Sequence, residues 1–530
     1  MLREDEYFHN LTEEEIWQRY CGFLDLSMDE FMKIQEDLLM EEIDLVADSV
    51  LGKKIMGGNR PANMEEFRKV VPLTTYEDYM PYIDNCQEDA LAIKPYFWAH
   101  TSGRGGNFKW IPYTSSAFET ITRRTIAAAI LASAEVKGQV NLAPGLSVLL
   151  NVASRPYITG ALFHYLSKYF SFKAIPPLEE AEEMEFQERV EKGFKIALRD
   201  GVDFIFSISS VLAKIGEKSA QQTQGIEFSP YMLRPQVLLL LVRAWLRSKR
   251  QRRGILPKNL WSSKAIVTSG TDTAIYRDDI AYYWGTAPYE AYSSTEMVMS
   301  AIQSWDKEKG MYFLPDVAFW EFIPEEERRK SREDNTYQPS TVLLNEIVPG
   351  NRYEIVLTHF HGMPFLRYCI GDLMQITAMS DTETGIKLPQ MVFQTRVDGV
   401  IHLASLTELD EKTIWQAITN TGLKYEDWSA CKGYAQNHTF LHLYIEIKED
   451  KTAEQMEDMV DEQLNLIDKD YRDLNSLLDL RPVKVTLLSQ GTFQRYYEEK
   501  RKQGADLSHL KPPHITQSDD VIQELLRLSQ

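Results

Sequence analysis

Apolar residues recur at helical spacing near the start of the chain. Ser27 and Glu30 have the spacing of a capping box, and apolar residues follow at positions 31, 34, 38 and 39. In a capping box the hydroxyl and the acidic side chain each accept a hydrogen bond from a backbone amide at the start of a helix. Residues three or four positions apart share one helix face. The pattern therefore predicts a long amphipathic helix with a structural role.

From about residue 90 to 395, short apolar runs alternate with longer helical patterns. Ser147–Val152 and Phe204–Ile208 have the length and content of buried strands, whereas Glu185–Arg199 has helical spacing. Such alternation is typical of an α/β domain. Glu325–Ser340 is charged and polar, which predicts a surface loop between strands.

The pattern changes after about residue 395. Apolar and polar residues alternate from Leu441 to Ile447 and again from Val483 to Leu487, as in half-buried strands. A helical stripe of apolar residues runs between them, from Met456 to Ile467. We therefore expect a compact α+β C-terminal domain and find no internal repeat.

Length and charge narrow the class of protein. A chain of 530 residues exceeds the roughly 250–300 residues of a single hydrophobic core, so two or more domains are expected. There are 58 Lys and Arg residues against 78 Asp and Glu residues, a net charge of −20, which argues against general affinity for nucleic acid or for an anionic membrane. The chain has one basic cluster, for which a solvated helix end is favoured over a nucleic-acid site. Its members are Arg243, Arg247, Lys249, Arg250, Arg252 and Arg253.

Cysteine usage and the apolar runs indicate a cytoplasmic protein. The four cysteines lie far apart, without a CxxC pair, so neither a disulfide framework nor a zinc site is predicted. The N-terminal residues are acidic and lack the apolar core of a signal peptide. The most apolar run, Val237–Val242, is far shorter than the ~20 residues of a membrane span. We expect no membrane or nucleic-acid partner and a monomer or weak homodimer.

The first segment that could carry chemistry is rich in glycine. Glycines let backbone amides approach an anion closely, and hydroxyls and a lysine can complete a phosphate-binding loop. The spacing is not that of a P-loop, and an ordinary loop is the alternative. The residues are Thr101, Ser102, Gly103, Arg104, Gly105, Gly106, Asn107, Phe108 and Lys109.

The second segment places hydroxyls before a carboxylate. It consists of Tyr292, Ser293, Ser294, Thr295 and Glu296. Hydroxyls and a carboxylate can hold a phosphate and Mg²⁺, because magnesium is usually bound by one or two carboxylates together with substrate phosphates. The alternative is a polar loop with a helix cap.

The third segment follows a strand pattern at Glu354–Thr358. Arg367 precedes Gly371-Asp372, where the aspartate could accept hydrogen bonds from ribose hydroxyls, or the pair could form a simple turn. His359 and His361 have the spacing of one strand face, which makes a metal site conceivable, although contacts supporting a site or its substrate are favoured.

The three segments, in this order and followed by a small domain, resemble the Gretchen Hagen 3 family of acyl-acid amido synthetases, which are adenylate-forming enzymes. The first resembles TSGTTGxxKxIP, the second YGSTE and the third RYxxGD. Further matches are Phe319–Pro324, Pro349-Gly350 and Gly491-Thr492-Phe493, so the resemblance covers about Pro72 to Ile515. We expect the chain to be a divergent member of bacterial type.

The resemblance implies an α/β fold with a large adenylating N-terminal domain of mixed sheets and helices, residues 1–395. A small, mobile α+β C-terminal domain, residues 396–530, would follow. The implied reaction adenylates a carboxylic acid with ATP and Mg²⁺ and transfers the acyl group to an amine, usually that of an amino acid. Pyrophosphate and AMP are released. Stabilising charge on the α-phosphate and positioning the reactants would supply most of the catalysis.

The resemblance also assigns roles to residues. Thr101, Ser102, Gly103 and Arg104 are expected at the phosphates, Tyr292 near adenine, and Asp372 at the ribose. Thr295 and Glu296 are expected to hold the α-phosphate and Mg²⁺, with Glu296 as the metal ligand. Ser294 is expected to contact the nucleotide, and Arg396 is expected to do so from the hinge. Those expected to supply positive charge to the reaction are Lys109, Arg367 and Lys511. Pro156, Tyr157 and Gly160 would lie near the acyl group.

The chain also departs from the family pattern. Arg104 and Gly105 replace two hydroxyl residues, Ser293 and Met297 replace glycines, and a lysine expected after Arg396 is missing. The sequence Lys511-Pro512-Pro513-His514 stands where a Lys-x-Pro-Arg pattern is expected. Two alternative functions therefore stay open. The enzyme could transfer the acyl group to a thiol such as coenzyme A or a carrier protein, or the protein could be a degenerate relative that binds nucleotide or acyl ligand without turnover.

Overall fold

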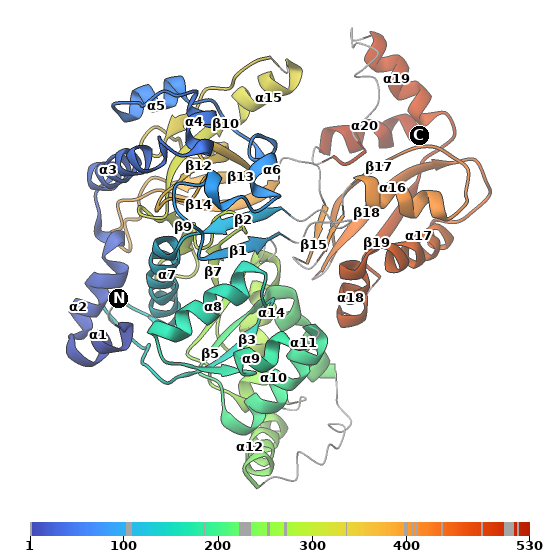
Figure 1. The fold of residues 1–530 in the computed structure, drawn as a ribbon. Helices are drawn as coiled ribbons and strands as arrows, with labels where there is room; N and C mark the ends of the chain where they lie inside the picture. The colour runs from blue at the N-terminus through green and yellow to red at the C-terminus, as the bar shows by residue number, and fades with distance from the viewer. Residues whose placement is uncertain are drawn as a thin grey trace. The chain divides into compact units, whose positions relative to one another are not determined.

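In the described part of the chain, the largest β-sheet is mixed and has twelve strands. Figure 1 shows the computed structural model. The structure describes residues 3–101, 109–184, 186–221, 235–251, 255–269, 273–334, 336–396, 401–404, 407–409, 411–435, 438–478, 481–502, 514–516 and 519–530. Two units are formed: unit 1 comprises residues 1–207, 216–269 and 278–395, and unit 2 comprises residues 208–215, 270–277 and 396–530.

The twelve-stranded sheet belongs to unit 1, and its strand pairing is parallel towards one edge and antiparallel towards the other. Its strands, in spatial order, are β11 (Val342–Leu343), β10 (Ala318–Pro324), β12 (Arg352–His359), β13 (Tyr368–Ala378), β14 (Gln390–Arg396), β9 (Met311–Phe313), β8 (Ala301–Gln303), β7 (Tyr289–Tyr292), β6 (Ala265–Ser269), β5 (Phe204–Ile208), β3 (Ser147–Asn151) and β4 (Lys173–Ile175). Strand β3 pairs in parallel with β4 and β5, and β6 pairs in parallel with β7. From β7 through β8 to β9, and from β11 through β10 to β12 and β13, the pairing is antiparallel.

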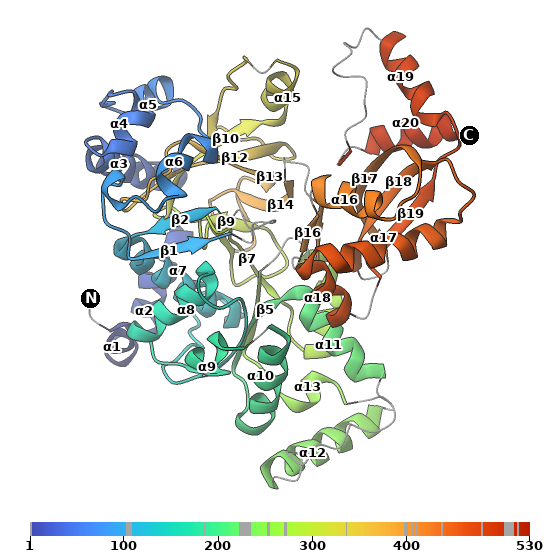
Figure 2. The same cartoon turned by 45° about the vertical axis from the view of Figure 1, so that its right-hand side comes forward.

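The helices of unit 1 lie around this sheet (Figures 1 and 2). They are α1 (Glu4–Asn10), α2 (Glu13–Cys21), α3 (Met28–Val46), α4 (Val50–Met56), α5 (Met64–Val70), α6 (Met80–Ile83), α7 (Ser115–Ser133), α8 (Ile158–Tyr169), α9 (Leu178–Glu182), α10 (Phe186–Asp200), α12 (Pro235–Gln251), α13 (Pro257–Leu260) and α15 (Glu325–Glu333), with α11 (Ser209–Gln221) and α14 (Thr273–Trp284) shared between the units. Short 3₁₀ helices lie at η1 (Gly22–Asp25), η2 (Tyr76–Asp78) and η3 (Glu88–Ala90).

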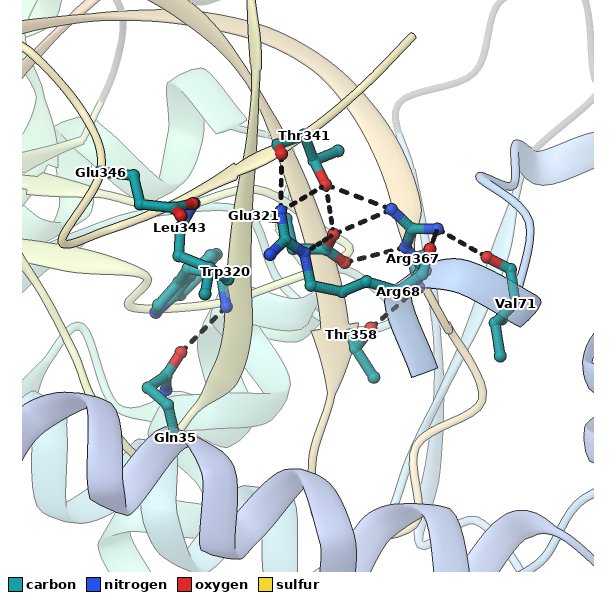
Figure 3. Close-up of polar contacts among 10 residues, drawn as sticks. All are labelled: Gln35, Arg68, Val71, Trp320, Glu321, Thr341, Leu343, Glu346, Thr358 and Arg367. Carbon is teal, nitrogen blue, oxygen red and sulfur yellow. Dashed lines mark hydrogen bonds and ion pairs between the residues drawn. The ribbon is translucent and has the colours of Figure 1, made fainter. Parts of the chain in front are cut away.

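The predicted N-terminal amphipathic helix is confirmed as α3. The Ser27 hydroxyl accepts a hydrogen bond from the Glu30 amide, and the Glu30 carboxylate accepts one from the Ser27 amide at 2.8 Å, which completes the capping box. Phe31 and Leu39 are buried on the inner face. The buried Gln35 side chain fixes the helix to β10, because its amide nitrogen donates to the carbonyl of Ala318. Its oxygen accepts from the amide of Trp320 (Figure 3).

The prediction of a surface loop at Glu325–Ser340 is wrong for its first half, which forms α15. Three acidic residues fill the first turn, where they interact favourably with the helix dipole. Lys330 lies 2.8 Å from Glu327, one turn earlier on the same face. Charged residues with good helix propensity and such pairs form a solvated helix without an apolar stripe, and the absence of that stripe made the segment resemble a loop.

Unit 2 contains the α+β arrangement predicted for the C-terminus. Its elements after residue 396 are β15 (Ile401–Leu403), β16 (Thr407–Leu409), α16 (Glu411–Asn420), β17 (Tyr425–Ala435), β18 (His438–Ile447), α17 (Ala453–Ile467), α18 (Lys469–Leu478), β19 (Val483–Leu487), α19 (Thr492–Lys502) and α20 (Asp519–Ser529). Strand β18 lies between β17 and β19, antiparallel to the first and parallel to the second. Trp428, Leu443 and Leu464 are buried in its core.

The architecture confirms the expected α/β class, with a large mixed sheet followed by a small α+β unit. The predicted strands at 147–152 and 204–208 are β3 and β5, and the helix predicted at 185–199 is α10. In the described part of the chain, no helix combines the length and the apolar content required to cross a membrane.

Candidate functional site

The glycine-rich segment connects the two strands of a hairpin in unit 1. Strand β1 (Phe97–His100) pairs antiparallel with β2 (Trp110–Tyr113). At the base of the connection the Thr101 amide donates to the Lys109 carbonyl at 3.0 Å, and the Lys109 amide donates to the Thr101 hydroxyl at 3.3 Å. Ser102, Gly103 and Arg104, which the sequence assigns to phosphate, lie outside the described residues. The hairpin therefore fixes both ends of the predicted phosphate loop.

Lys109 lies over an anchored tyrosine. Its ammonium nitrogen is 5.1 Å from the centre of the Tyr76 ring, within the range of a cation–π contact. The Tyr76 hydroxyl donates to the Asp84 carboxylate at 2.7 Å and accepts from the Trp110 amide at 2.8 Å. Burial and the Asp84 carboxylate raise the pKa of Tyr76, so this hydroxyl keeps its proton. Tyr76 thus holds the Lys109 side chain at the end of the hairpin.

The second segment is a tight connection between β7 and β8, held by two buried side chains from elsewhere. The Tyr113 hydroxyl donates to the Thr295 carbonyl at 2.8 Å, and the His359 imidazole contacts the Glu296 carbonyl, also at 2.8 Å. Ser294 accepts a hydrogen bond from the Met297 amide through its hydroxyl, which gives this predicted phosphate ligand a role in the turn itself. The backbone around Glu296 is therefore fixed from two sides.

His359 acts as a neutral donor. Burial lowers its pKa to about 3. Its Nδ1 accepts from the Phe365 amide, so the Nε2 carries the proton and donates to the Glu296 carbonyl. His361 has left-handed backbone and directs its own Nε2 to the carbonyl of Asp316. The two histidines contact different carbonyls, which fits the supporting role that the sequence favoured over a shared metal.

The Glu296 carboxylate is suited to a cation. Its residue is only 6% exposed, yet within the described part of the chain no side chain donates a hydrogen bond to that carboxylate or forms an ion pair with it. A carboxylate in such a place is costly without a positive partner. No group of three or more His, Cys, Asp or Glu residues that could enclose a metal is found among the described residues. One carboxylate fits magnesium that is bound mainly by substrate phosphates.

The second and third segments meet at a short hydrogen bond. The Tyr292 hydroxyl donates to the Asp372 carboxylate at 2.5 Å, and the Tyr292 ring stacks on Phe393 with centroids 6.1 Å apart. Gly371-Asp372 is not a free turn, because both residues lie within β13, where the register with β12 shifts. Gly371 has a φ of 79°, which a side chain would strain. The shift is a local bulge, and it delivers Asp372 to Tyr292 across 80 residues of sequence.

Arg367, which is expected to supply positive charge to the reaction, is bound instead by groups of unit 1 itself. Its Nε and Nη2 donate to the two oxygens of Glu321, at 3.0 and 2.9 Å, and its Nη1 donates to the carbonyls of Arg68 and Val71, both at 2.6 Å (Figure 3). Every guanidinium nitrogen therefore already has a protein acceptor. Glu321 is 1% exposed and also accepts from Arg68 and from the Thr341 hydroxyl. The physical reason is that a buried carboxylate needs a cation. Arg367 directly precedes β13, so its contacts with Glu321 and Arg68 brace the start of that strand to β10 and α5.

The segment expected near the acyl group lies beside β1. The His100 amide donates to the Pro156 carbonyl at 3.3 Å, and the rings of His100 and Tyr157 are 4.6 Å apart. At Gly160 an added Cβ would lie 2.5 Å from the backbone of Arg155, so only glycine allows α8 to start so close to the preceding turn. Pro156 and Tyr157 are thus neighbours of the phosphate hairpin.

Sequence reasoning missed Glu42, a buried carboxyl group on α3. Its residue is 2% exposed, and one oxygen accepts from the Gly362 amide at 2.9 Å. Burial raises the pKa of Glu42 to about 8, and the single hydrogen bond opposes that rise only partly. Gly362 belongs to the turn after His359, so Glu42 supports the backbone that holds Glu296. A glutamate on the inner stripe of a predicted helix was the signal available in the sequence.

We expect Glu42→Gln to stabilise the protein at alkaline pH. The folded state keeps the Glu42 proton to about pH 8 and the unfolded state releases it near pH 4.5, so wild-type stability falls as pH rises between these values. The amide cannot ionise, and the variant should gain about 4 kcal/mol at pH 8 and nearly nothing at pH 4.5. Denaturant unfolding across this range measures the difference. Glu41→Gln, on the exposed side of α3, is the control, and parallel curves for wild type and Glu42→Gln would refute the prediction.

In unit 2, Lys511 lies outside the described residues, and the side chain of Arg396 is likewise not described. His514, three residues after Lys511, is described and lies in a box of acidic and aromatic groups. Its Nδ1 contacts Glu411 at 2.6 Å, its Nε2 contacts Asp427 at 2.8 Å, and its ring stacks on Trp428 at 4.3 Å. The Asp427 carboxylate also accepts from the Tyr497 hydroxyl at 2.5 Å. The box ties the chain after Lys511 to β17.

We expect this box to loosen as the pH rises. Burial acts to lower the pKa of His514, but hydrogen bonds to Asp427 and Glu411 outweigh burial and raise it above the ordinary 6.5. The stabilisation is therefore complete below pH 6.5 and is lost as the pH passes through the folded-state pKa. Hydrogen exchange of the Ala430 and Thr516 amides, corrected for the intrinsic rate, should show about tenfold less protection once His514 is neutral. His514→Gln should give low protection at every pH. Protection in the wild type that does not change with pH would contradict the prediction.

Comparison with known protein families covers most of the chain. Residues 21–158 match the GH3 family N-terminal domain, residues 311–396 the GH3 family central domain and residues 411–520 the GH3 family C-terminal domain. The N-terminal match contains the β1–β2 hairpin, and the central match contains Arg367 and Asp372.

Two curated plant relatives illustrate the similarity. The chain is 26% identical over 250 residues to indole-3-acetic acid-amido synthetase GH3.17 of Arabidopsis thaliana, over 40% of this chain and 38% of that protein. The chain therefore spans well under half the length of that relative in the alignment. A longer alignment, 22% identical over 566 residues and covering 93% of each protein, joins it to putative indole-3-acetic acid-amido synthetase GH3.9 of the same plant.

Solved structures share the fold. AtGH3.15 acyl acid amido synthetase in complex with 2,4-DB superposes with a TM-score of 0.55 at 17% identity, covering 97% of this chain and 96% of that one. A 2-hydroxyisobutyryl-CoA ligase in complex with 2-HIB-AMP and CoA superposes with a TM-score of 0.56 at 14% identity, covering 87% of each chain. At these identities the likeness concerns the fold.

Proposed function

Because the chain belongs to the GH3 family, we propose that it is an ATP-dependent ligase that joins a carboxylic acid to an amine. A carboxylate oxygen attacks the α-phosphorus of ATP, and pyrophosphate leaves. The amine nitrogen then attacks the acyl carbon and loses a proton, AMP leaves, and an amide forms. The names of the relatives support an amide product, since two describe amido synthetases of indole-3-acetic acid. An amino acid as the amine is supported by the name of an Oryza sativa relative, jasmonoyl--L-amino acid synthetase GH3.5.

One observation carries this proposal: hydrogen bonds link the three predicted segments. Tyr113, on the strand that ends the phosphate hairpin, holds Thr295. Tyr292, at the start of the second segment, holds Asp372 of the third. Groups that are remote in sequence are thereby kept around one place, as positioning of a nucleotide requires.

The residues of unit 1 receive the following roles in the proposal. Thr101, Ser102, Gly103 and Arg104 bind phosphate oxygens, Lys109 adds positive charge, Thr295 binds the α-phosphate, and Asp372 binds the ribose while Tyr292 orients it. Glu296 holds Mg²⁺, which would neutralise charge that develops on the phosphates. By resemblance alone, Arg396 serves the hinge and Lys511 the reaction. We assign residues 1–395 to adenylation, residues 396–530 to a mobile C-terminal domain, and the protein to the cytoplasm as a monomer or weak homodimer.

Pyrophosphate release from the purified chain tests the function. ATP, Mg²⁺ and a panel of carboxylic acids are combined with each amino acid in turn, and products are identified by mass spectrometry. Pyrophosphate release that needs the acid, together with an amide of matching mass, would establish the activity. ATP consumption without an amide would refute it.

A second candidate is transfer to a thiol, favoured by the shared fold of the 2-hydroxyisobutyryl-CoA ligase. Coenzyme A in place of the amine would then give a thioester of the activated acid. A third candidate, binding without turnover, is supported by Arg104 and Gly105 in the altered loop and by the missing lysine after Arg396. Saturable ATP binding with no pyrophosphate release from any acid would favour it.

We expect Asp372→Ala to weaken ATP binding by about ten- to a hundredfold, because a hydrogen bond to a charged group contributes about 1.5–3 kcal/mol. Titration calorimetry measures the affinity. Tyr292→Phe keeps the carboxylate and removes only its hydroxyl partner, so it should weaken binding less. Unchanged affinity in Asp372→Ala would remove the nucleotide assignment under all three candidate functions.

A further inference from the structure

Helix α12 of unit 1 lies in a stretch whose charge is opposite to that of the protein. Between residues 228 and 271 there are nine basic residues and no Asp or Glu, in a chain whose net charge is −20. The basic residues are Arg234, Arg243, Arg247, Lys249, Arg250, Arg252, Arg253, Lys258 and Lys264. Charges act over roughly 8–10 Å in physiological salt, so a surface beside α12 experiences this local charge more than the average of the whole chain.

The same helix exposes a large apolar face. Residues at i, i+1, i+4, i+7 and i+8 share one side of a helix. The exposed apolar residues of α12 have this spacing: Leu238 at 49%, Leu239 at 52%, Val242 at 45%, Trp245 at 49% and Leu246 at 57% exposure. Val237 and Ala244, a different side of the helix, are fully buried. In both views α12 lies at the margin of unit 1, and Figure 2 shows it near α13, with which it is in contact.

We propose that α12 is an interfacial helix that binds reversibly to an anionic lipid surface. Exposed leucine, valine and tryptophan next to arginine are the composition of helices that lie in the headgroup region of a bilayer. Arg243 is exposed beside the apolar face, where it can reach lipid phosphates. The helix has 17 residues and several charges, so it would lie along the surface rather than cross it.

Charge and attachment favour lipid over the other occupants. A second copy of the chain would bring two basic, acid-free helices together, which is unfavourable. A groove on another protein would also take the apolar face of the helix, but it would need acidic groups placed beside the basic residues, which an anionic lipid surface supplies everywhere. A planar surface needs only the exposed side. The averaged charge that argued against membranes therefore does not describe this part of the molecule.

Vesicle co-sedimentation of the full chain tests the proposal. The probes are vesicles of phosphatidylcholine alone and of phosphatidylcholine mixed with phosphatidylglycerol. We expect binding to the mixed vesicles at least about tenfold stronger than to the neutral ones, weakening as salt rises. Leu239→Asp with Leu246→Asp should reduce binding at least about tenfold, and Arg243→Glu about tenfold.

Matched controls separate this face from general effects. Leu45→Asp changes a 43% exposed leucine on α3 and should leave vesicle binding unchanged. Circular dichroism and the melting temperature check that each variant is folded. Equal binding to neutral vesicles, no binding to either kind, or a wild-type dimer that the Leu239→Asp/Leu246→Asp variant dissociates without any vesicle binding would each overturn the proposal. Binding of an acidic protein to this helix, without binding to the vesicles, would overturn it too.

Discussion

The Glu296→Ala variant is expected to lose about a hundred- to a thousandfold of acid-dependent pyrophosphate release while its melting temperature stays close to wild type. Removing a group that stabilises developing charge in a dry site has effects of this size. Folding should survive, because Tyr113 and His359 hold this segment through backbone carbonyls, which alanine retains. Steady-state pyrophosphate assays over a range of Mg²⁺ concentrations measure the loss.

Two further variants sharpen that experiment. Glu296→Asp keeps the charge on a shorter side chain, so part of its activity should return at high Mg²⁺. Glu308→Ala removes an exposed glutamate from the same unit and should behave as wild type. Wild-type turnover in Glu296→Ala would end the metal assignment but leave the proposed reaction standing.

The Arg367→Met variant is expected to lose about 3 kcal/mol of stability, since removing one partner of a buried ion pair leaves an uncompensated charge. The Glu321 side chain is 1% exposed and, among the described residues, would keep Arg68 as its one remaining cation, at 3.3 Å. Two backbone carbonyls, of Arg68 and Val71, would also lose their donor. Denaturant unfolding of the purified variant measures the loss.

The double variant Arg367→Met/Glu321→Leu distinguishes charge from packing. If the buried charge is the cause, removing Glu321 as well should restore most of the stability. Lys33→Met disrupts an exposed ion pair with Asp37 and should leave stability unchanged. If the double variant stays destabilised, lost packing rather than the buried charge is the cause. A single variant as stable as wild type would contradict the structural role of Arg367.

Local patterns in the sequence were sufficient for many elements. The capping box at Ser27 and Glu30 forms because its partners are three residues apart, and β18 and α17 follow from spacing that any buried strand or helix must have. The missed helix α15 shows the limit, since a solvated helix needs no apolar stripe and leaves only its charge pattern as a signal.

The chemistry of a residue type did not identify its partner. A guanidinium binds a carboxylate as readily as a phosphate, and the sequence assigned Arg367 to the reaction while the fold provides Glu321, 46 residues away. Glu42 presents the same difficulty, because an inner helical position does not reveal whether a cation will face it.

The sequence by itself determined the order of the three candidate segments, the helical and strand periods and the family to which they point. Those properties depend on residues close together in the chain. Only the tertiary structure decided that Tyr292 meets Asp372, that His359 holds the carbonyl of Glu296 and that Arg367 is used as a brace. The physical reason is that these contacts join strands distant in sequence, and each exists only because a buried polar group must find a partner wherever the fold brings one.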